Sequence, residues 1–211
     1  MTYEVSKRCI DVVLSIVAIV LLSPVFIAVA SLIKLTSPGT VLYRGVRAGR
    51  NGRNFYILKF RTMVADAERM GGASTAVDDP RLTRIGRSLR RYKLDELPQF
   101  FNVLGGSMSL VGPRPQVLSY TEKYEGEERL ILSMRPGITD LASLYFSDMD
   151  KTLGSGDVDA KYAREVEPVK NVLRLRYVKE ASLLLDFRIL IETAFKLVGV
   201  DSATGLNLKP R

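Results

Sequence analysis

Residues 12–33 read VVLSIVAIVLLSPVFIAVASLI, an uncharged run of 22 residues in which 15 are Val, Ile, Leu or Phe. Each such side chain favours bilayer insertion by roughly 0.3–0.6 kcal/mol, so the run predicts a membrane-inserted helix. A buried core helix is usually shorter and carries a polar stripe, whereas the polar side chains here are three scattered serines. A cleaved signal peptide is the other alternative, but its apolar region would be shorter.

Two features bear on how this run sits in a bilayer. Lys7 and Arg8 precede it and Lys34 follows it, which conflicts with the charge asymmetry that orients a spanning helix. Ser23-Pro24 falls near the middle, where proline kinks a helix. The helical half on each side of this pair would be ~15–18 Å long, which matches half the thickness of the hydrocarbon core, ~15 Å. The residues alone leave a spanning helix and a re-entrant helix equally open.

The composition excludes several kinds of chemistry. The chain has no His and one Cys, Cys9, so a Ser-His-Asp centre, a Cys-His centre and a His-ligated zinc site are impossible. The net charge of +8 indicates anionic partners. Nucleic acid is disfavoured because the chain has no Trp and no zinc-finger spacing. Anionic lipid or phosphorylated substrates fit better, because a cationic stretch directly follows the apolar run.

The pattern predicts an α+β fold that is mostly helical, with short strands at 40–45 and 55–60 joined through Gly49 and Gly52. Further expected segments are helices over 95–105, 117–133 and 160–198, the last with a break near 182–186, and an extended piece over 138–146. These elements divide the chain into a membrane-inserted helix (1–34), one globular domain (35–200) and a loose tail (201–211).

The stretch Leu94-Asp95-Glu96-Leu97-Pro98-Gln99 is the first candidate site. Pro98 suits the first turn of a helix, which would put Asp95 and Glu96 at the positive end of that helix. Acidic residues there are usually caps. Neighbouring helical residues point in different directions, so the pair suggests distinct roles, one carboxylate as nucleophile and one as support.

Arginines beside rigid turns indicate an anion site. Gly112-Pro113-Arg114-Pro115 places one between two prolines, and Arg135-Pro136-Gly137 repeats the arrangement. A guanidinium binds phosphate through a planar two-pronged contact. Further basic residues precede Asp95, namely Arg87, Arg90, Arg91 and Lys93. A single one of these would be read as a solvated surface charge, but their recurrence favours anion binding.

With these motifs in order, the chain resembles the bacterial sugar transferases, the monotopic phosphoglycosyl transferases that begin the assembly of lipid-linked glycans. The matching landmarks are Lys7-Arg8 with Asp11, Ser23-Pro24, Lys59 to Met63, Leu94 to Gln99, Phe101-Asn102-Val103, Ser107-Met108-Ser109, Gly112 to Pro115, and Arg135 to Thr139. They cover about residues 3–198, the family's minimal catalytic unit.

The resemblance implies a re-entrant helix bent at Ser23-Pro24, in the bacterial inner (cytoplasmic) membrane, with the catalytic domain on the cytoplasmic face. It implies that Asp95 attacks the β-phosphorus of a UDP-sugar, releases UMP and forms an aspartyl-phosphosugar intermediate. Polyprenyl phosphate then takes the sugar phosphate. Mg²⁺ is required, with Asp95 as its protein ligand. Glu96 assists catalysis. The implied substrate-binding residues are Lys59, Arg90, Arg114 and Arg135.

One departure concerns the segment after Thr139. The family continues with Gly-Leu and a later phosphate-contacting arginine, whereas this chain has Asp140-Leu141 and then Ser147 at the arginine's place. Lys151 is a candidate substitute. The departure bears on the donor pocket and sugar choice more than on the reaction.

Two other functions stay open from the residues: a noncatalytic membrane-bound scaffold or anionic-lipid-binding module, and a phosphohydrolase with water as acceptor. The sequence leaves open the sugar, the polyprenol length, the glycan pathway and the oligomeric state, a homodimer being one alternative.

Overall fold

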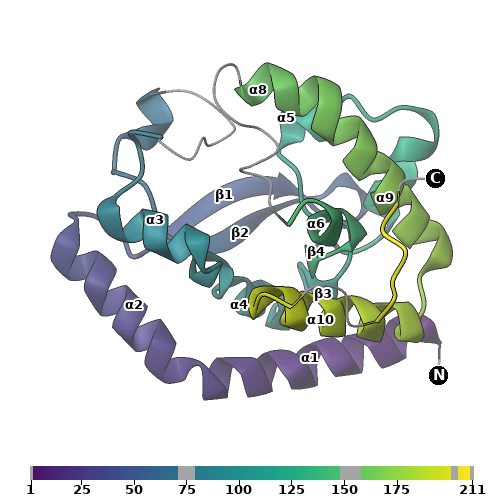
Figure 1. Cartoon of the computed structure of the whole chain (residues 1–211), viewed down its shortest axis with the longest axis horizontal. Helices are drawn as coiled ribbons and strands as arrows, with labels where there is room; N and C mark the ends of the chain where they lie inside the picture. The colour runs from purple at the N-terminus through teal and green to yellow at the C-terminus, as the bar shows by residue number, and fades with distance from the viewer. Residues whose placement is uncertain (1, 71–78, 148–157, 201–203, 210–211) are drawn as a thin grey trace.

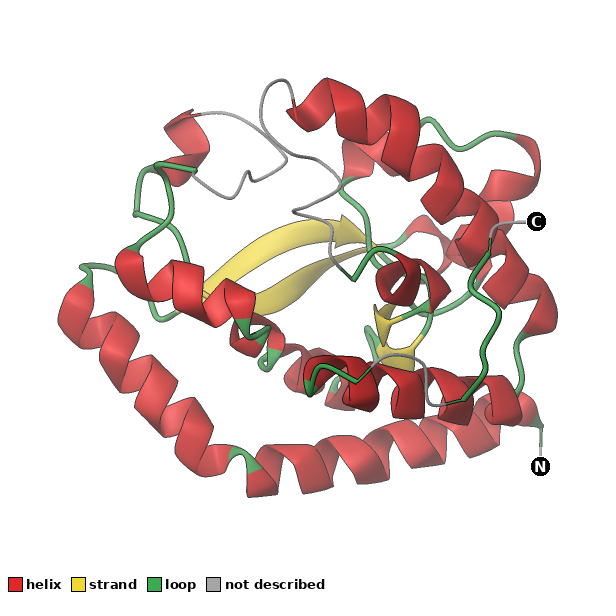
Figure 2. Cartoon of the chain, viewed as in Figure 1, coloured by secondary structure: helices red, strands yellow, loops and turns green. Residues whose placement is uncertain are grey.

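The computed structural model of the chain describes residues 2–70, 79–147, 158–200 and 204–209. Helices dominate, and the strands form two small two-stranded sheets, one antiparallel and one parallel (Figure 2). The predicted α+β class with mostly helical content is therefore confirmed. The division into three segments at 34 and 200 stays an interpretation.

The apolar run forms two helices, α1 (Tyr3–Leu21) and α2 (Ser23–Thr36), which meet at a bend of 62°. Pro24 lies in the first turn of α2, and the Ser23 hydroxyl donates a hydrogen bond of 2.8 Å to the Val20 carbonyl. The predicted break at this pair is confirmed. No described helix is by itself long and apolar enough to cross a bilayer, although the bent pair together meets that test. Re-entry stays a prediction.

The two helices run one after the other along the outside of the molecule (Figure 1). Their inward faces bury Asp11 and Ser15 on α1 and Val29 and Ile33 on α2. Their outward faces expose large apolar side chains, among them Val13, Ile16, Val17, Val20, Leu21, Ile27 and Leu32. Such a continuous exposed apolar surface is unusual for a protein surrounded by water.

Strands β1 (Leu42–Ala48) and β2 (Asn54–Phe60) form an antiparallel hairpin. The turn contains the short 3₁₀ element η1 (Arg50–Gly52), in which Asn51 and Gly52 have φ of 57° and 72°. Both residue types tolerate this left-handed backbone. The second strand lies where it was predicted, and the first is shifted toward the turn relative to the prediction of 40–45.

The middle of the chain consists of short elements. They are η2 (Ala67–Met70), α3 (Arg84–Arg91), η3 (Leu94–Glu96), α4 (Gln99–Leu104), β3 (Ser109–Val111), α5 (Leu118–Thr121), η4 (Gly126–Ser133), β4 (Gly137–Thr139) and α6 (Leu141–Tyr145). Strands β3 and β4 are parallel.

Two predictions for this region are wrong. The expected helix over 117–133 is divided into α5 and η4, because Gly126, the first residue of η4, takes a φ of 50°. The expected extended piece over 138–146 ends at Thr139, because the carboxylate of Asp140 caps a new helix by accepting a hydrogen bond of 2.6 Å from the Ser143 N–H.

The C-terminal part is helical, as predicted. It comprises α8 (Val158–Lys161), the π-helix η5 (Tyr162–Val166), α9 (Glu167–Glu180) and α10 (Leu183–Leu197). The break falls at Ala181-Ser182, where Ser182 caps α10 through the Leu185 N–H. The tail, expected to be loose, is held in its described part: Glu192 accepts two hydrogen bonds from Thr204.

Two apolar cores hold these elements together. The larger joins β2, α4, β3, α6, α9 and α10, with Val103, Leu141, Leu173 and Ile189 almost fully buried. The smaller packs α2 and α3 against the hairpin through Val29, Ile33, Leu89 and Phe60. The hairpin and the turn before α4 thus lie between two rigid supports, and both carry candidate site residues.

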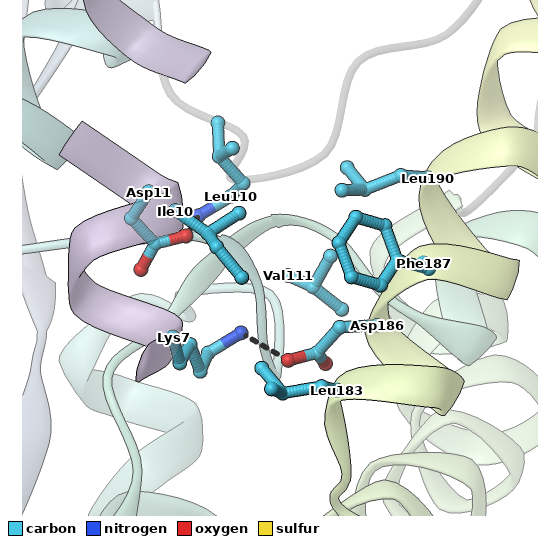
Figure 3. Close-up of a pocket in the computed structure, with 9 residues that line it drawn as sticks. All are labelled: Lys7, Ile10, Asp11, Leu110, Val111, Leu183, Asp186, Phe187 and Leu190. Atoms are coloured by element: carbon cyan, nitrogen blue, oxygen red, sulfur yellow. Dashed lines mark hydrogen bonds and ion pairs between the residues drawn. The ribbon is translucent and has the colours of Figure 1, made fainter. Parts of the chain in front are cut away.

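A cluster of polar side chains joins α1 to α9 and α10, and Figure 3 shows its Lys7–Asp186 contact between α1 and α10. The carboxylate of Asp186 accepts hydrogen bonds from Lys7 Nζ at 2.8 Å, Tyr3 at 3.0 Å and Tyr177 at 2.6 Å. Asp11 lines the same small pocket and accepts a hydrogen bond from the Leu110 N–H at 3.0 Å. This cluster contains none of the predicted site residues, and it fixes α1 to the rest of the domain.

Candidate active site

The two adjacent carboxylates lie in a tight turn before α4. Lys93 takes a left-handed conformation with φ of 56°, and η3 then carries Asp95 and Glu96. Helix α4 begins at Gln99, directly after Pro98. The predicted helix start at Asp95 is therefore wrong, because the acidic pair occupies a 3₁₀ turn of its own and Pro98 is the N-cap of α4.

Asp95 is buried, with 5% of its surface exposed. Within the described residues its carboxylate has no hydrogen-bond or ion-pair partner. Burial raises the pKa of Asp95, Glu96 adds to this effect, and the charges of Lys59, Arg90 and Arg114 oppose it. A buried carboxylate surrounded by cations but bonded to none of them is available to react.

Glu96 has the opposite environment. Its carboxylate is bridged by Lys59 Nζ at 2.8 Å and by both terminal nitrogens of Arg114, NH1 lying 3.1 Å from Oε2. Although burial raises the pKa of Glu96, Arg114 and Lys59 outweigh it and hold the net pKa well below the usual range. Glu96 in turn raises the pKa of Arg114. Glu96 is thus a fixed anion that holds two cations, and the predicted division of roles between the two carboxylates is consistent with this geometry.

A rigid turn holds Arg114. Its N–H donates to Asp140 at 2.9 Å, and its NH1 also donates to the Ile138 carbonyl at 3.1 Å. Gly112 and Gly137 allow the two backbones to cross closely, since a methyl group added at Gly137 would lie 2.1 Å from the Gly112 nitrogen. The predicted preorganisation of this arginine therefore rests on glycines and on Asp140 as well as on the flanking prolines.

The structure places the other predicted ligands at different distances from the carboxylates. Arg90 lies close enough to lower the pKa of Asp95, and its Nε donates to the Thr62 hydroxyl at 3.0 Å. Arg135 instead donates to the Gly106 carbonyl at 3.2 Å. No contact among the described residues brings Arg135 to Asp95, and its role as a substrate ligand stays a prediction.

A buried polar network is connected to Arg114 through Asp140, and the sequence did not predict it. Arg174, 1% exposed, lies 2.9 Å from Glu167 and 4.0 Å from Asp140. Lys170 is also buried, and its Nζ lies 4.8 Å from the centre of the Tyr162 ring. Burial, followed by Arg174 and Arg114, lowers the pKa of Lys170 to about 7. The helical period of 160–198 predicts which residues face inward, but no signal in the sequence identifies a buried lysine.

The structure describes only part of the segment after Thr139 in which the chain departs from the family pattern. Ser147 receives a hydrogen bond of 3.2 Å from Lys196 Nζ. The suggested substitute for the missing arginine, Lys151, lies outside the described residues.

Comparison with known proteins places these features in a family. The family model for bacterial sugar transferases matches residues 2–199. The chain is 37% identical over 197 residues to the UDP-N-acetylgalactosamine-undecaprenyl-phosphate N-acetylgalactosaminephosphotransferase of Aeromonas hydrophila. It is 39% identical over 195 residues to the UDP-glucose:undecaprenyl-phosphate glucose-1-phosphate transferase of Escherichia coli K12. It is 36% identical over 204 residues to the exopolysaccharide production protein ExoY of Sinorhizobium fredii.

These matches differ in extent. Each covers 90% of the chain, but the matched part is 43% of the Aeromonas protein, 39% of the Escherichia protein and 84% of the Sinorhizobium protein. The family match spans both the bent helix pair and the turn with Asp95 and Glu96. The chain belongs to the bacterial sugar transferase family.

Proposed function

We propose that this chain transfers a sugar 1-phosphate from a UDP-sugar to a polyprenyl phosphate, giving polyprenyl-diphosphate-sugar and UMP. Two relatives are named as transferases that use undecaprenyl phosphate, with UDP-N-acetylgalactosamine and UDP-glucose respectively. The single observation that carries the proposal is Asp95, a buried carboxylate without a bonded partner in the described chain, next to a carboxylate already neutralised by two cations.

The proposed reaction has two displacements at one phosphorus. In the first, an oxygen of Asp95 bonds to the β-phosphorus, the bond from that phosphorus to the bridging oxygen breaks, and UMP leaves with the electron pair. In the second, an oxygen of the polyprenyl phosphate attacks the same phosphorus and the carboxylate of Asp95 is released. Each half uses a good leaving group, which is the advantage of covalent catalysis.

The neighbouring residues support these steps by position and charge. Glu96 holds Lys59 and Arg114 beside Asp95, so two cations are in place before the substrate arrives. Preorganised charge of this kind costs no rearrangement during the reaction. Arg90 adds a third positive charge near Asp95. These residues would bind the phosphate oxygens on which negative charge accumulates.

This site suits a magnesium ion held by a single carboxylate together with substrate phosphates and water. No group of three or more His, Cys, Asp or Glu side chains that could cage a metal occurs in the part of the chain that the structure describes. Mg²⁺ is commonly held by one or two carboxylates, substrate phosphates and water, and Asp95 is the carboxylate at the site not engaged by a cation. Asp95 would hold the ion, which would neutralise phosphate charge when bound.

The proposal places α1 and α2 in one membrane leaflet, with the domain on the cytoplasmic face. Support comes from the exposed apolar faces of both helices, the 62° bend, and basic residues at both ends. Polyprenyl phosphate is itself a membrane lipid, so its phosphate would lie at the surface on which the domain rests.

The decisive experiment measures UMP release from a panel of UDP-sugars, with and without polyprenyl phosphate. Asp95→Asn should abolish release, since an amide is a poor nucleophile. Asp11→Asn is the matched control: Asp11 is equally buried, and an asparagine oxygen can still accept from the Leu110 N–H, so turnover should persist. Without acceptor, the wild-type protein should gain the mass of one sugar phosphate on the peptide that contains Asp95.

The competing functions give different results. Turnover that does not depend on the lipid acceptor would indicate a phosphohydrolase. Absence of UMP release with every UDP-sugar, together with retained binding to anionic vesicles, would indicate a scaffold or lipid-binding module. Near wild-type turnover in Asp95→Asn would refute the assigned nucleophile.

A further inference from the structure

One face of the β1–β2 hairpin is directed at the carboxylates. Because side chains alternate along a strand, Tyr43, Gly45 and Arg47 share a face of β1, and Tyr43 pairs across the hairpin with Lys59. The Lys59 amine contacts Glu96, so this face is turned toward the candidate site. Arg44 lies on the opposite face of the same strand and is exposed.

Gly45 leaves the space in which Tyr43 and Arg47 meet. A methyl group added at Gly45 would lie 2.9 Å from the Tyr43 hydroxyl oxygen and 3.1 Å from NH1 of Arg47. The guanidinium of Arg47 donates to the Val46 carbonyl at 2.7 Å and lies beside the Tyr43 hydroxyl, whose proximity raises the pKa of Arg47. These contacts hold the guanidinium in place, and its other N–H groups donate to no residue in the part of the chain that the structure describes.

Unlike Lys59 and Arg114, which contact Glu96, Arg47 has no carboxylate partner among the described residues. It is half-buried. Burial lowers its pKa, and Arg114 lowers it further while Tyr43 opposes both. The end of β1 is joined to the Arg114 turn by the Ala48 N–H, which donates to the Gln116 carbonyl at 3.2 Å. A partly desolvated guanidinium without a counter-charge, beside a phosphate-type site, is suited to an incoming anion.

We propose that Arg47 binds the donor phosphate that departs with the nucleoside. The inference rests on the proposed function. Asp95 attacks the sugar-bearing phosphorus, so the second phosphate, which takes the electron pair, needs a cation of its own. Lys59 and Arg114 are engaged by Glu96, whereas the contacts of Arg47 with the described residues are the Val46 carbonyl and the neighbouring Tyr43 hydroxyl.

The test uses UMP, the product that carries this phosphate, titrated directly onto the full-length protein in lipid nanodiscs. A charge-assisted hydrogen bond is worth roughly 1.5–3 kcal/mol, so Arg47→Met should weaken UMP binding by roughly ten- to a hundredfold. Arg44→Met removes the same charge from the opposite face of the strand and should change UMP binding less than twofold. Gly45→Ala keeps every charge but displaces Tyr43 and Arg47, and should weaken UMP binding several-fold.

Uridine, which lacks the phosphate, separates the phosphate contact from a general loss of the site. Its binding should be the same in wild type and Arg47→Met. Equal UMP binding by wild type and Arg47→Met, or equal losses in Arg47→Met and Arg44→Met, would overturn the inference. A wild-type chain that binds UMP but releases none from any UDP-sugar would refute the transferase while the Arg47 comparison still stands on binding alone.

Discussion

Replacing Lys170 by Met should change how stability depends on pH. The Lys170 amine is buried against the rings of Tyr162 and Phe146, at 4.8 and 5.6 Å, and donates to the Tyr162 hydroxyl at 3.3 Å. Burial lowers its pKa from 10.5 to about 7, and Arg174 and Arg114 add to the shift, whereas Asp140 and Glu167 oppose it. The neighbouring carboxylates already bind other groups, so the amine is not fully compensated.

The direction of the effect follows from proton binding. Because the pKa of Lys170 is lower in the folded chain, the unfolded chain binds more protons between about pH 7 and 10.5, and stability rises with pH across this window. At roughly 1.4 kcal/mol per unit, the wild type should gain about 2 kcal/mol between pH 7 and 9 that the Lys170→Met variant does not gain. For a chain of this size that is roughly 4–8 °C in Tm.

The assay is thermal unfolding in detergent at pH 7, 8 and 9, followed by circular dichroism. Lys170→Met should melt above the wild type at pH 7, and its advantage should shrink by roughly 4–8 °C at pH 9. Lys179→Met is the matched control on the same helix, because Lys179 is exposed and paired with Glu127; its profile should run parallel to that of the wild type. Parallel profiles for Lys170→Met as well would show that Lys170 is not a buried, weakly basic amine.

Three further predictions concern the site and the α1–α2 helix pair. Arg114→Lys should lower kcat/KM by more than tenfold, because lysine keeps the charge but loses the two-pronged contact; a smaller loss would show that Arg114 is not a positioned phosphate ligand. With Cys9 removed, cysteines placed at Thr2 and Thr40 should both be labelled from the cytoplasmic side only. Labelling of position 2 from the outer side would show that the helix spans the membrane instead. Pro24→Ala should weaken the bend and expose a fraction of N-termini outside.

Local chemistry in the sequence predicted the elements that depend on it. Ser23-Pro24 marks the bend between α1 and α2, and Gly106, with φ of 82°, follows the end of α4 as expected. The same approach fails at 117–133 and 138–146. There the outcome depends on Gly126 adopting a positive φ and on Asp140 serving as a cap, and a glycine or an aspartate can occupy other conformations equally well.

The candidate site shows the same limit at the level of single side chains. The sequence singles out Asp95, Glu96 and Arg114 because each lies in a distinctive local motif. It does not show that Arg114 and Lys59 share one carboxylate, because Lys59 and Glu96 are 37 residues apart. The sequence did not single out Arg47 or Lys170, because neither lies in a turn or beside a proline. The position of Arg47 depends on the register of the hairpin, and the lowered pKa of Lys170 depends on its burial.

Arg8, which belongs to the Lys7-Arg8 and Asp11 motif in α1, contacts the helix that follows the candidate site. The guanidinium of Arg8 donates to the carbonyls of Val103 and Leu104, at 2.6 and 2.9 Å, at the C-terminal end of α4. A cation there satisfies carbonyls that have no partner within the helix and complements its dipole. The same short helix directly follows the turn that carries Asp95. Helix α1 therefore fixes the element that positions the proposed nucleophile. In the membrane placement proposed above, the depth of α1 would set the height of Asp95 above the lipid surface.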